Sequence, residues 1–194
     1  MARPKAFDRD EVLKAATAVF WAKGYEAAST DDLLAAMGIS RQSLYDTYGG
    51  KRALYLEALA RYQADSLATR IATLTRPDSP LAGLSDILTA VAAESPELRA
   101  LGCMGVNAIC EFGQSDAEVK ASSAANAGVL QAALERVLRE AKARGEVAAE
   151  IDEGAAGRFL QTTLTGLKVY AKSGASPEAL REIADFAVAS LKPR

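Results

Sequence analysis

The sequence of 194 residues contains no histidine, and this absence argues against several classes of enzyme at once. Histidine is the usual general base of Ser-His-Asp and Cys-His catalysis, and it is the commonest side-chain ligand of transition metals. The chain also has no glycine-rich phosphate-binding loop and no cluster of metal-ligating residues in its sequence. We therefore expect a protein that is not an enzyme and that carries no cofactor and no metal.

Cysteine, aromatic residues and long apolar runs are also scarce. Two cysteines, Cys103 and Cys110, are too few for a disulfide framework, and aromatic residues make up only 6% of the chain. No run approaches the roughly 18 apolar residues that suggest a membrane span. Met1–Asp10 lacks the apolar segment of a signal peptide. These features predict a cytoplasmic protein without a membrane partner.

Neither positive nor negative charge is in large excess, since the formal net charge is −2. Residues 1–52 contain eight Lys or Arg and seven Asp or Glu, which is a net charge of +1, and the remainder carries −3. This balance argues against a surface covered with basic residues for non-specific nucleic-acid binding. It leaves room for a small face that reads DNA.

Helix-forming residues are abundant, and apolar residues recur at helical spacing along the whole chain. Capping residues and helix breakers divide this pattern into about nine helices and no strand. Asp8 caps a helix that ends at Gly24, and a Ser115–Glu118 capping box opens a long one. The predicted fold is all-α. Three helices within residues 1–52 precede a larger helical body, residues 53–194.

A helix-turn-helix is predicted between Ser29 and Thr47. Ser29 and Asp32 form a capping box, and Gly38 ends the helix that they open. Ser40 caps the next helix only two residues later. Two helices joined by such a short glycine-containing turn are typical of DNA-binding proteins.

The second of these helices has a polar outer face suited to base edges. Leu44 and Tyr48 are four residues apart and face the core, whereas Arg41, Gln42 and Ser43 lie on the other side. Arginine pairs with guanine, glutamine pairs with adenine, and hydroxyls bond to bases or phosphates. The alternative interpretation is an ordinary solvated helix face.

Residues 8–55 resemble the signature of the TetR family of bacterial transcriptional regulators. That signature has a threonine-rich entry to one helix, a short turn, a Leu-Tyr pair, a later aromatic residue and a Lys-x-x-Leu helix start. Here the matching positions are Ser29, Thr30, Gly38, Ile39, Ser40, Leu44, Tyr45, Tyr48, Lys51 and Leu54. The segment from Phe20 to Tyr25 also matches.

The resemblance implies a bacterial protein that binds double-stranded DNA. Residues 1–52 would be its DNA-binding domain, and residues 53–194 would be its domain for ligand binding and dimerisation. Thr30, Tyr45 and Lys51 would contact phosphates. The positions that would read bases are Arg41, Gln42, Ser43 and Thr47. One departure is Asp31, which stands where many relatives have a basic or neutral residue, so its charge would repel phosphate.

The last two predicted helices carry apolar residues on more than one side, which argues for a partner. In the resembled family this helix pair forms a four-helix dimer interface, so we expect a homodimer. The residues predicted to line the interface are Phe159, Leu160, Leu164, Leu167, Ile183 and Phe186. Burial inside one chain is the alternative.

The segment Gly102–Phe112 is the most unusual part of the C-terminal domain. Its Gly-Cys-x-x-Val-Asn stretch resembles one branch of the TetR family, in which some members sense oxidants or electrophiles through the cysteine. Cys103 is expected at a helix N-terminus, where the helix dipole lowers a thiol pKa. The other candidate effector residues are Met104, Asn107, Glu111 and Phe112. Ordinary packing is the alternative for all of them, as it is for Cys110.

Together these features predict a repressor that binds a palindromic operator as a homodimer and is released by a small-molecule or thiol-reactive effector. The alternative is a helical adaptor that has kept the fold and lost DNA binding.

Overall fold

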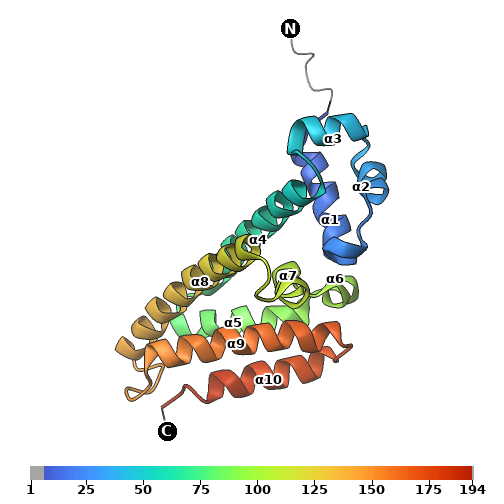
Figure 1. Cartoon of the computed structure of the whole chain (residues 1–194). Coiled ribbons are helices and arrows are strands. Elements are labelled where there is room, and N and C mark those ends of the chain that lie inside the picture. Colours follow the sequence, from blue (N-terminus) through green and yellow to red (C-terminus); the bar gives the residue numbers. More distant parts are fainter. Residues whose placement is uncertain (1–6, 194) are drawn as a thin grey trace. The chain divides into compact units, whose positions relative to one another are not determined.

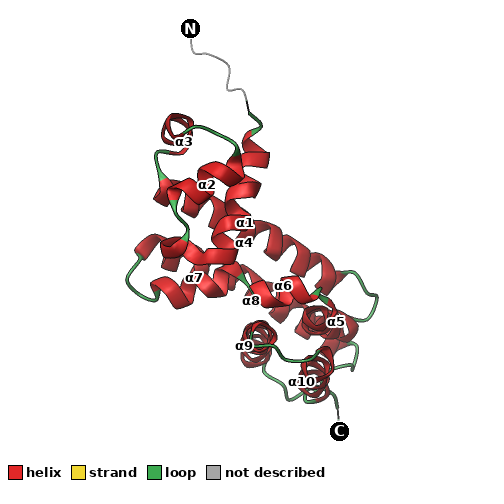
Figure 2. Ribbon diagram, turned by 90° about the vertical axis from the view of Figure 1, so that its right-hand side faces the viewer, coloured by secondary structure: helices red, strands yellow, loops and turns green. Residues whose placement is uncertain are grey.

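The computed structural model describes residues 7–193, and this part of the chain folds into ten helices without a strand (Figures 1 and 2). The helices are α1 (Arg9–Ala27), α2 (Thr30–Met37), α3 (Arg41–Tyr48), α4 (Lys51–Thr75), α5 (Pro80–Ala93), α6 (Pro96–Leu101), α7 (Met104–Phe112), α8 (Ala117–Ala143), α9 (Glu153–Lys172) and α10 (Pro177–Ala189). The predicted all-α fold is confirmed. Within residues 7–193, no helix is long and apolar enough to cross a membrane.

Local signals account for two short helical segments. Helix α6 is a separate helix because the Ser95 hydroxyl caps it and Pro96 occupies its first turn. The helix that begins at Arg9 is interrupted at Gly24, as predicted, where φ is 78° and ψ is 179°. One further helical turn follows the break and completes α1 at Ala27.

The chain forms two compact units. The head unit comprises residues up to Ala64 together with Met104–Ser123, and the body unit comprises Asp65–Cys103 and the chain from Ala124 onward. Long helices α4 and α8 contribute residues to both. The compact unit that holds the helix-turn-helix is thus larger than the predicted DNA-binding domain, because it includes a segment distant in sequence. The functional boundary near residue 52 remains a prediction.

The head unit has a core of aromatic and aliphatic side chains. Phe20, Leu33, Leu44 and Tyr55 are each at most 2% exposed. The core also contains Met104, Ala108 and Val119, which α7 and the start of α8 contribute. Helix α7 packs against α1. Residues 104–123 are therefore part of the structure that supports the helix-turn-helix.

The body unit has a purely aliphatic core made by α5, α8, α9 and α10 with the end of α4. Gly83 of α5 lies directly against α4, since a Cβ atom there would be 2.0 Å from the Leu74 carbonyl oxygen. A half-buried ion pair between Lys168 and Glu94 links α9 to the end of α5. Close helix approach and aliphatic interdigitation thus hold this unit together.

Candidate nucleic-acid interface

Local capping interactions define both helices of the helix-turn-helix. The Ser29 hydroxyl accepts a hydrogen bond from Asp32 N at 3.0 Å, and Asp32 Oδ2 accepts one from Ser29 N at 3.0 Å, so the predicted capping box is confirmed. Gly38 adopts a left-handed conformation (φ 64°) and ends α2. The Ser40 hydroxyl then accepts a hydrogen bond from Ser43 N at 3.1 Å and starts α3. Only Gly38, Ile39 and Ser40 separate the two helices.

The buried side of α3 determines which residues can reach a partner. Leu44 is fully buried and Tyr48 is 7% exposed. Arg41 and Gln42 are exposed on the other side, together with Tyr45 at 51%. Ser43 and Thr47 are half-buried at its margin. The predicted base readers therefore divide into two that stand clear of the protein and two that border the core.

The two exposed side chains that are predicted to contact bases, Arg41 and Gln42, are bonded to carboxylates of the same helix-turn-helix. Arg41 Nη2 lies 2.6 Å from Asp31 Oδ1 of α2. Gln42 Nε2 donates to Asp46 Oδ1 at 2.8 Å, one turn further along α3. The Ser43 hydroxyl accepts a hydrogen bond from the Ser40 hydroxyl at 3.0 Å. Asp31, which the sequence suggested would repel phosphate, is thus the ion-pair partner of the first residue of α3.

The predicted phosphate contacts stand at helix starts or on the outer face of α3. Thr30 is the first residue of α2, and Lys51 is the first residue of α4; both are half-buried. Lys51 Nζ lies 4.4 Å from the centroid of the Tyr25 ring and 3.5 Å from the Glu26 carbonyl oxygen. The ammonium group is therefore held by a cation–π contact, and Tyr25 joins the site as a residue to which sequence reasoning gave no role.

Glu111 of α7 holds the segment on which Lys51 rests. Its two carboxylate oxygens accept hydrogen bonds from Tyr25 N at 2.9 Å and from Glu26 N at 2.8 Å. These amides open the helical turn after the break at Gly24, where unpaired N–H groups need an acceptor. Glu111, which was predicted as an effector residue, thus caps this helical turn in the head unit. Glu111 lies far from the helix-turn-helix in the sequence, so no local sequence pattern could indicate this role.

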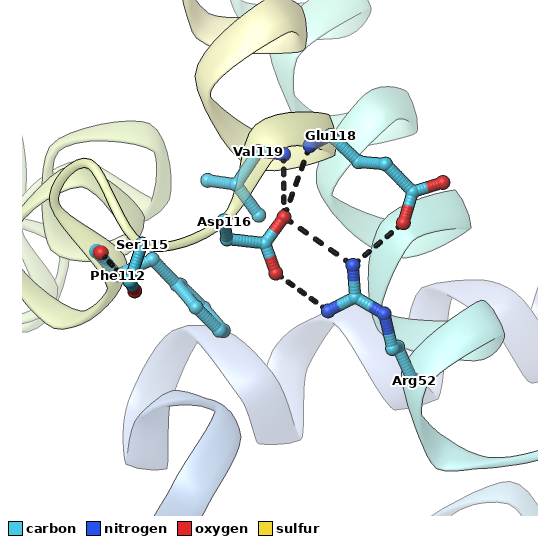
Figure 3. A network of polar contacts seen from close by, with 6 residues as sticks. All are labelled: Arg52, Phe112, Ser115, Asp116, Glu118 and Val119. Atoms are coloured by element: carbon cyan, nitrogen blue, oxygen red, sulfur yellow. Dashed lines mark hydrogen bonds and ion pairs between the residues drawn. The ribbon is translucent and has the colours of Figure 1, made fainter.

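A second network holds the start of α4 (Figure 3). The Arg52 guanidinium contacts Asp116 Oδ2 at 2.6 Å and Glu118 Oε2 at 2.6 Å. The Asp116 carboxylate also accepts hydrogen bonds from the Glu118 and Val119 amides, at 3.1 and 3.0 Å, and so caps α8. Arg52 and these amides lower the pKa of Asp116 to about 2. The predicted Ser115 cap is wrong, because the Ser115 hydroxyl donates backward to the Phe112 carbonyl oxygen.

The other predicted effector residues also occupy structural positions. Met104 is 1% exposed in the head core, and the Phe112 ring lies 5.6 Å from Tyr25 and 5.5 Å from Tyr55 between centroids. Both side chains thus pack in the core of the head unit, and their role toward an effector stays a prediction. Asn107 is half-buried on α7.

The two cysteines differ in exposure. Cys103 is buried in the body unit directly before α7, and Arg70 Nη2 lies 3.9 Å from its sulfur. Cys110 is exposed on α7, contrary to the packing interpretation. Cys103 alone therefore combines burial with a neighbouring cation.

The predicted dimer residues also differ in exposure, and three of them are buried whereas three are exposed. Leu160, Leu164 and Leu167 are at most 4% exposed and belong to the core of their own chain. These three side chains are covered by their own chain, and their contact with a partner stays a prediction. Phe159, Ile183 and Phe186 remain exposed on α9 and α10.

The fold and this interface define a helix-turn-helix regulator, and comparisons with known proteins agree. Residues 12–58 match the family model of bacterial regulatory proteins, tetR family, and residues 81–187 match the tetracyclin repressor-like C-terminal domain. The uncharacterized HTH-type transcriptional regulator YezE of Bacillus subtilis (strain 168) is 36% identical over 98% of this chain and 100% of its own. The HTH-type transcriptional repressor ComR of Escherichia coli (strain K12) is 30% identical over 94% of this chain and 88% of its own.

A solved structure gives the same result. The TetR family transcriptional regulator CifR, a cysteine mutant complexed with 26-bp double-strand operator DNA, has a TM-score of 0.84 and 33% identity. The match covers 98% of this chain and 100% of CifR. The chain belongs to the TetR family of bacterial transcriptional regulators. It is a DNA-binding regulator and, as predicted, not an enzyme.

Proposed function

We propose that this protein is a repressor of the bacterial cytoplasm that binds a palindromic operator as a homodimer and is released by an effector. The observation that carries the proposal is the exposed face of α3, where Arg41 and Gln42 stand beside Tyr45 on a capped helix-turn-helix. The similarity to CifR, whose structure contains operator DNA, supports it. Arg41, Gln42, Ser43 and Thr47 would read bases. Thr30, Tyr45 and Lys51 would contact phosphates.

The proposed dimer uses the apolar surface that α9 and α10 leave uncovered. Phe186 is 76% exposed, and Phe159 and Ile183 are 44% and 41% exposed. Gly166 of α9 lies in open space, which allows a partner helix to approach closely. Two copies are needed because a palindromic operator presents half-sites about 34–36 Å apart in successive major grooves.

The proposed effector is a small molecule or a thiol-reactive compound that acts at Cys103. The guanidinium of Arg70 lies beside the sulfur, and a cationic neighbour is typical of cysteines that react with oxidants and electrophiles, which supports this role. A Cys103→Ser variant should keep operator binding and lose release by such compounds. Equal release of variant and wild type by a panel of oxidants and electrophiles would contradict the thiol mechanism.

One observation favours the alternative of an adaptor that has lost DNA binding. Cations of the head unit are neutralised within the protein, in the pairs Arg9–Glu57, Lys23–Asp32, Arg41–Asp31 and Arg52–Asp116. Binding to the DNA upstream of the protein's own gene, measured over a range of salt concentrations, separates the two. A regulator gives sequence preference and an affinity that falls with salt, and an adaptor gives neither.

A further inference from the structure

The position of Asp31 calls for an explanation beyond helix capping. The N-terminal end of α2 is already capped by Ser29 and Asp32. Asp32 also forms an ion pair with Lys23 at 2.8 Å. The Asp31 side chain is 84% exposed and points to Arg41 of the other helix. A carboxylate at the start of a helix gains some stability from the helix dipole, but this gain does not require Arg41 as a partner.

The pair changes what Arg41 can do on DNA. An unpaired guanidinium on a flexible side chain forms ion pairs with any nearby phosphate, which adds affinity for every sequence. When one Nη atom is held by Asp31, the orientation of the planar group is restricted and donors on its other edge remain for a base. Guanine accepts two parallel N–H donors at O6 and N7, so an oriented guanidinium favours guanine over a randomly placed phosphate.

The charge of Asp31 acts in the same direction. A carboxylate next to Arg41 neutralises its attraction for the phosphate backbone and repels phosphates that approach closely. This penalty applies to all DNA, but only a site with a correctly placed guanine compensates for it. Specificity is a difference between two affinities, and a group that weakens the wrong complex more than the right one increases it.

We propose that Asp31 is a specificity-determining residue that acts through Arg41: it orients the guanidinium for base reading and weakens binding to DNA that lacks the operator sequence. The proposal rests on the proposed function, since it requires Arg41 to lie in the DNA interface. Asp31 is a positioning residue and does not itself contact a base. Its negative charge thereby increases discrimination between the operator and other DNA.

The test compares Asp31→Asn with wild type in the full-length protein. The specific probe is a duplex selected by wild type from a random-sequence pool, and the non-specific probe is a scrambled duplex of the same composition. We expect Asp31→Asn to bind the scrambled duplex more tightly, with a salt slope steeper by roughly 0.9 for one added phosphate contact. The ratio of the two affinities should fall roughly tenfold.

A matched control is Asp86→Asn. Asp86 forms an exposed ion pair with Arg76 at 3.2 Å in the body unit, so this variant makes the same change in net charge elsewhere. It should leave the affinity ratio unchanged. Asp31→Asn in an Arg41→Ala background should also leave the ratio of that background unchanged, because the residue acts through Arg41.

Two results would overturn the proposal alone. One is an unchanged affinity ratio in Asp31→Asn while wild type discriminates between the duplexes. The other is an equal loss of discrimination with and without Arg41. A wild-type protein that enriches no sequence from the pool would overturn the proposed function and this proposal with it.

Discussion

The two compact units of this chain use different side chains to build their cores. Every buried side chain of the body core is Leu, Ile, Val or Ala, whereas the head core includes Phe20, Tyr48, Tyr55 and two methionines. The head also depends on charged side chains from residues 104–123, which cap the last turn of α1 and pair with the start of α4. Short helices have little apolar face of their own, so aromatic packing and caps must hold their orientation. Long helices need only an aliphatic stripe.

The largest expected effect is on the packing of the body unit. Gly83→Ala should lower the free energy of unfolding by about 3 kcal/mol, because its Cβ atom would overlap the Leu74 carbonyl and force α5 away from α4. Chemical denaturation followed by circular dichroism measures the change. Gly128→Ala on α8 is the matched control, since nothing lies within 4 Å of a Cβ there and alanine is the better helix former. Similar stabilities for the two variants would contradict close packing at Gly83.

The exposed surface of the body unit is tested next. Phe186→Glu should prevent dimerisation and weaken operator binding roughly a hundredfold, about 2.7 kcal/mol, because it places a charge in an apolar interface. Sedimentation and operator titration measure the two effects. Leu98→Glu, at another exposed apolar position of the same unit, should change neither. A dimeric Phe186→Glu protein would show that the interface lies elsewhere.

The head unit is tested through its long-range cap. Glu111→Gln keeps the shape and leaves one oxygen to accept two amide donors, so it should destabilise the head by about 1 kcal/mol. It should also weaken DNA binding several-fold, since Lys51 rests on Tyr25 and Glu26. Hydrogen exchange at these two amides and operator titration provide the readouts.

The control is Glu26→Gln, which removes the same charge from an exposed side chain nearby and should have neither effect. Unchanged hydrogen exchange in Glu111→Gln would refute the capping role.

The smallest expected effect is the pH dependence that Asp116 of the head contributes. The folded pKa of Asp116 is about 2, below its ordinary value of 3.8, so its ion pair stabilises the fold above about pH 4. That contribution is lost as the pH falls from about 4 toward 2. The difference in unfolding free energy between wild type and Asp116→Asn should therefore shrink over this interval in denaturant titrations. A constant difference from pH 6 to pH 2 would mean that Asp116 does not act through its charge.

Local signals in the sequence were sufficient for the helix-turn-helix. Ser29, Gly38 and Ser40 act on backbone groups within four residues of themselves, so their roles follow from spacing alone. The polar and buried sides of α3 were predictable for the same reason. Glu111 and Asp116 were not, because each bonds to residues more than 60 positions away, and no periodicity encodes such a contact.

The apolar positions of α9 also show what the sequence could not predict, namely which side chains another helix of the same chain covers. Helical spacing identified Phe159 and Leu160 as apolar neighbours, yet one is exposed and the other is buried. Periodicity gives the direction of a side chain around the helix axis, but not which neighbouring helix covers that direction. Three leucines predicted to meet a partner are therefore covered by their own chain.

The sequence by itself determined the all-α fold, the ends of most helices and the TetR-type motif, because helix propensity and capping depend on residues close together in the chain. Only the tertiary structure decided that residues 104–123 support the head, that Arg52 pairs with Asp116, and that Asp31 faces Arg41. These contacts join separate helices, and their geometry follows from how the cores pack. Asp31, read in isolation as a charge unfavourable for DNA, acquires its partner only when α2 and α3 fold together.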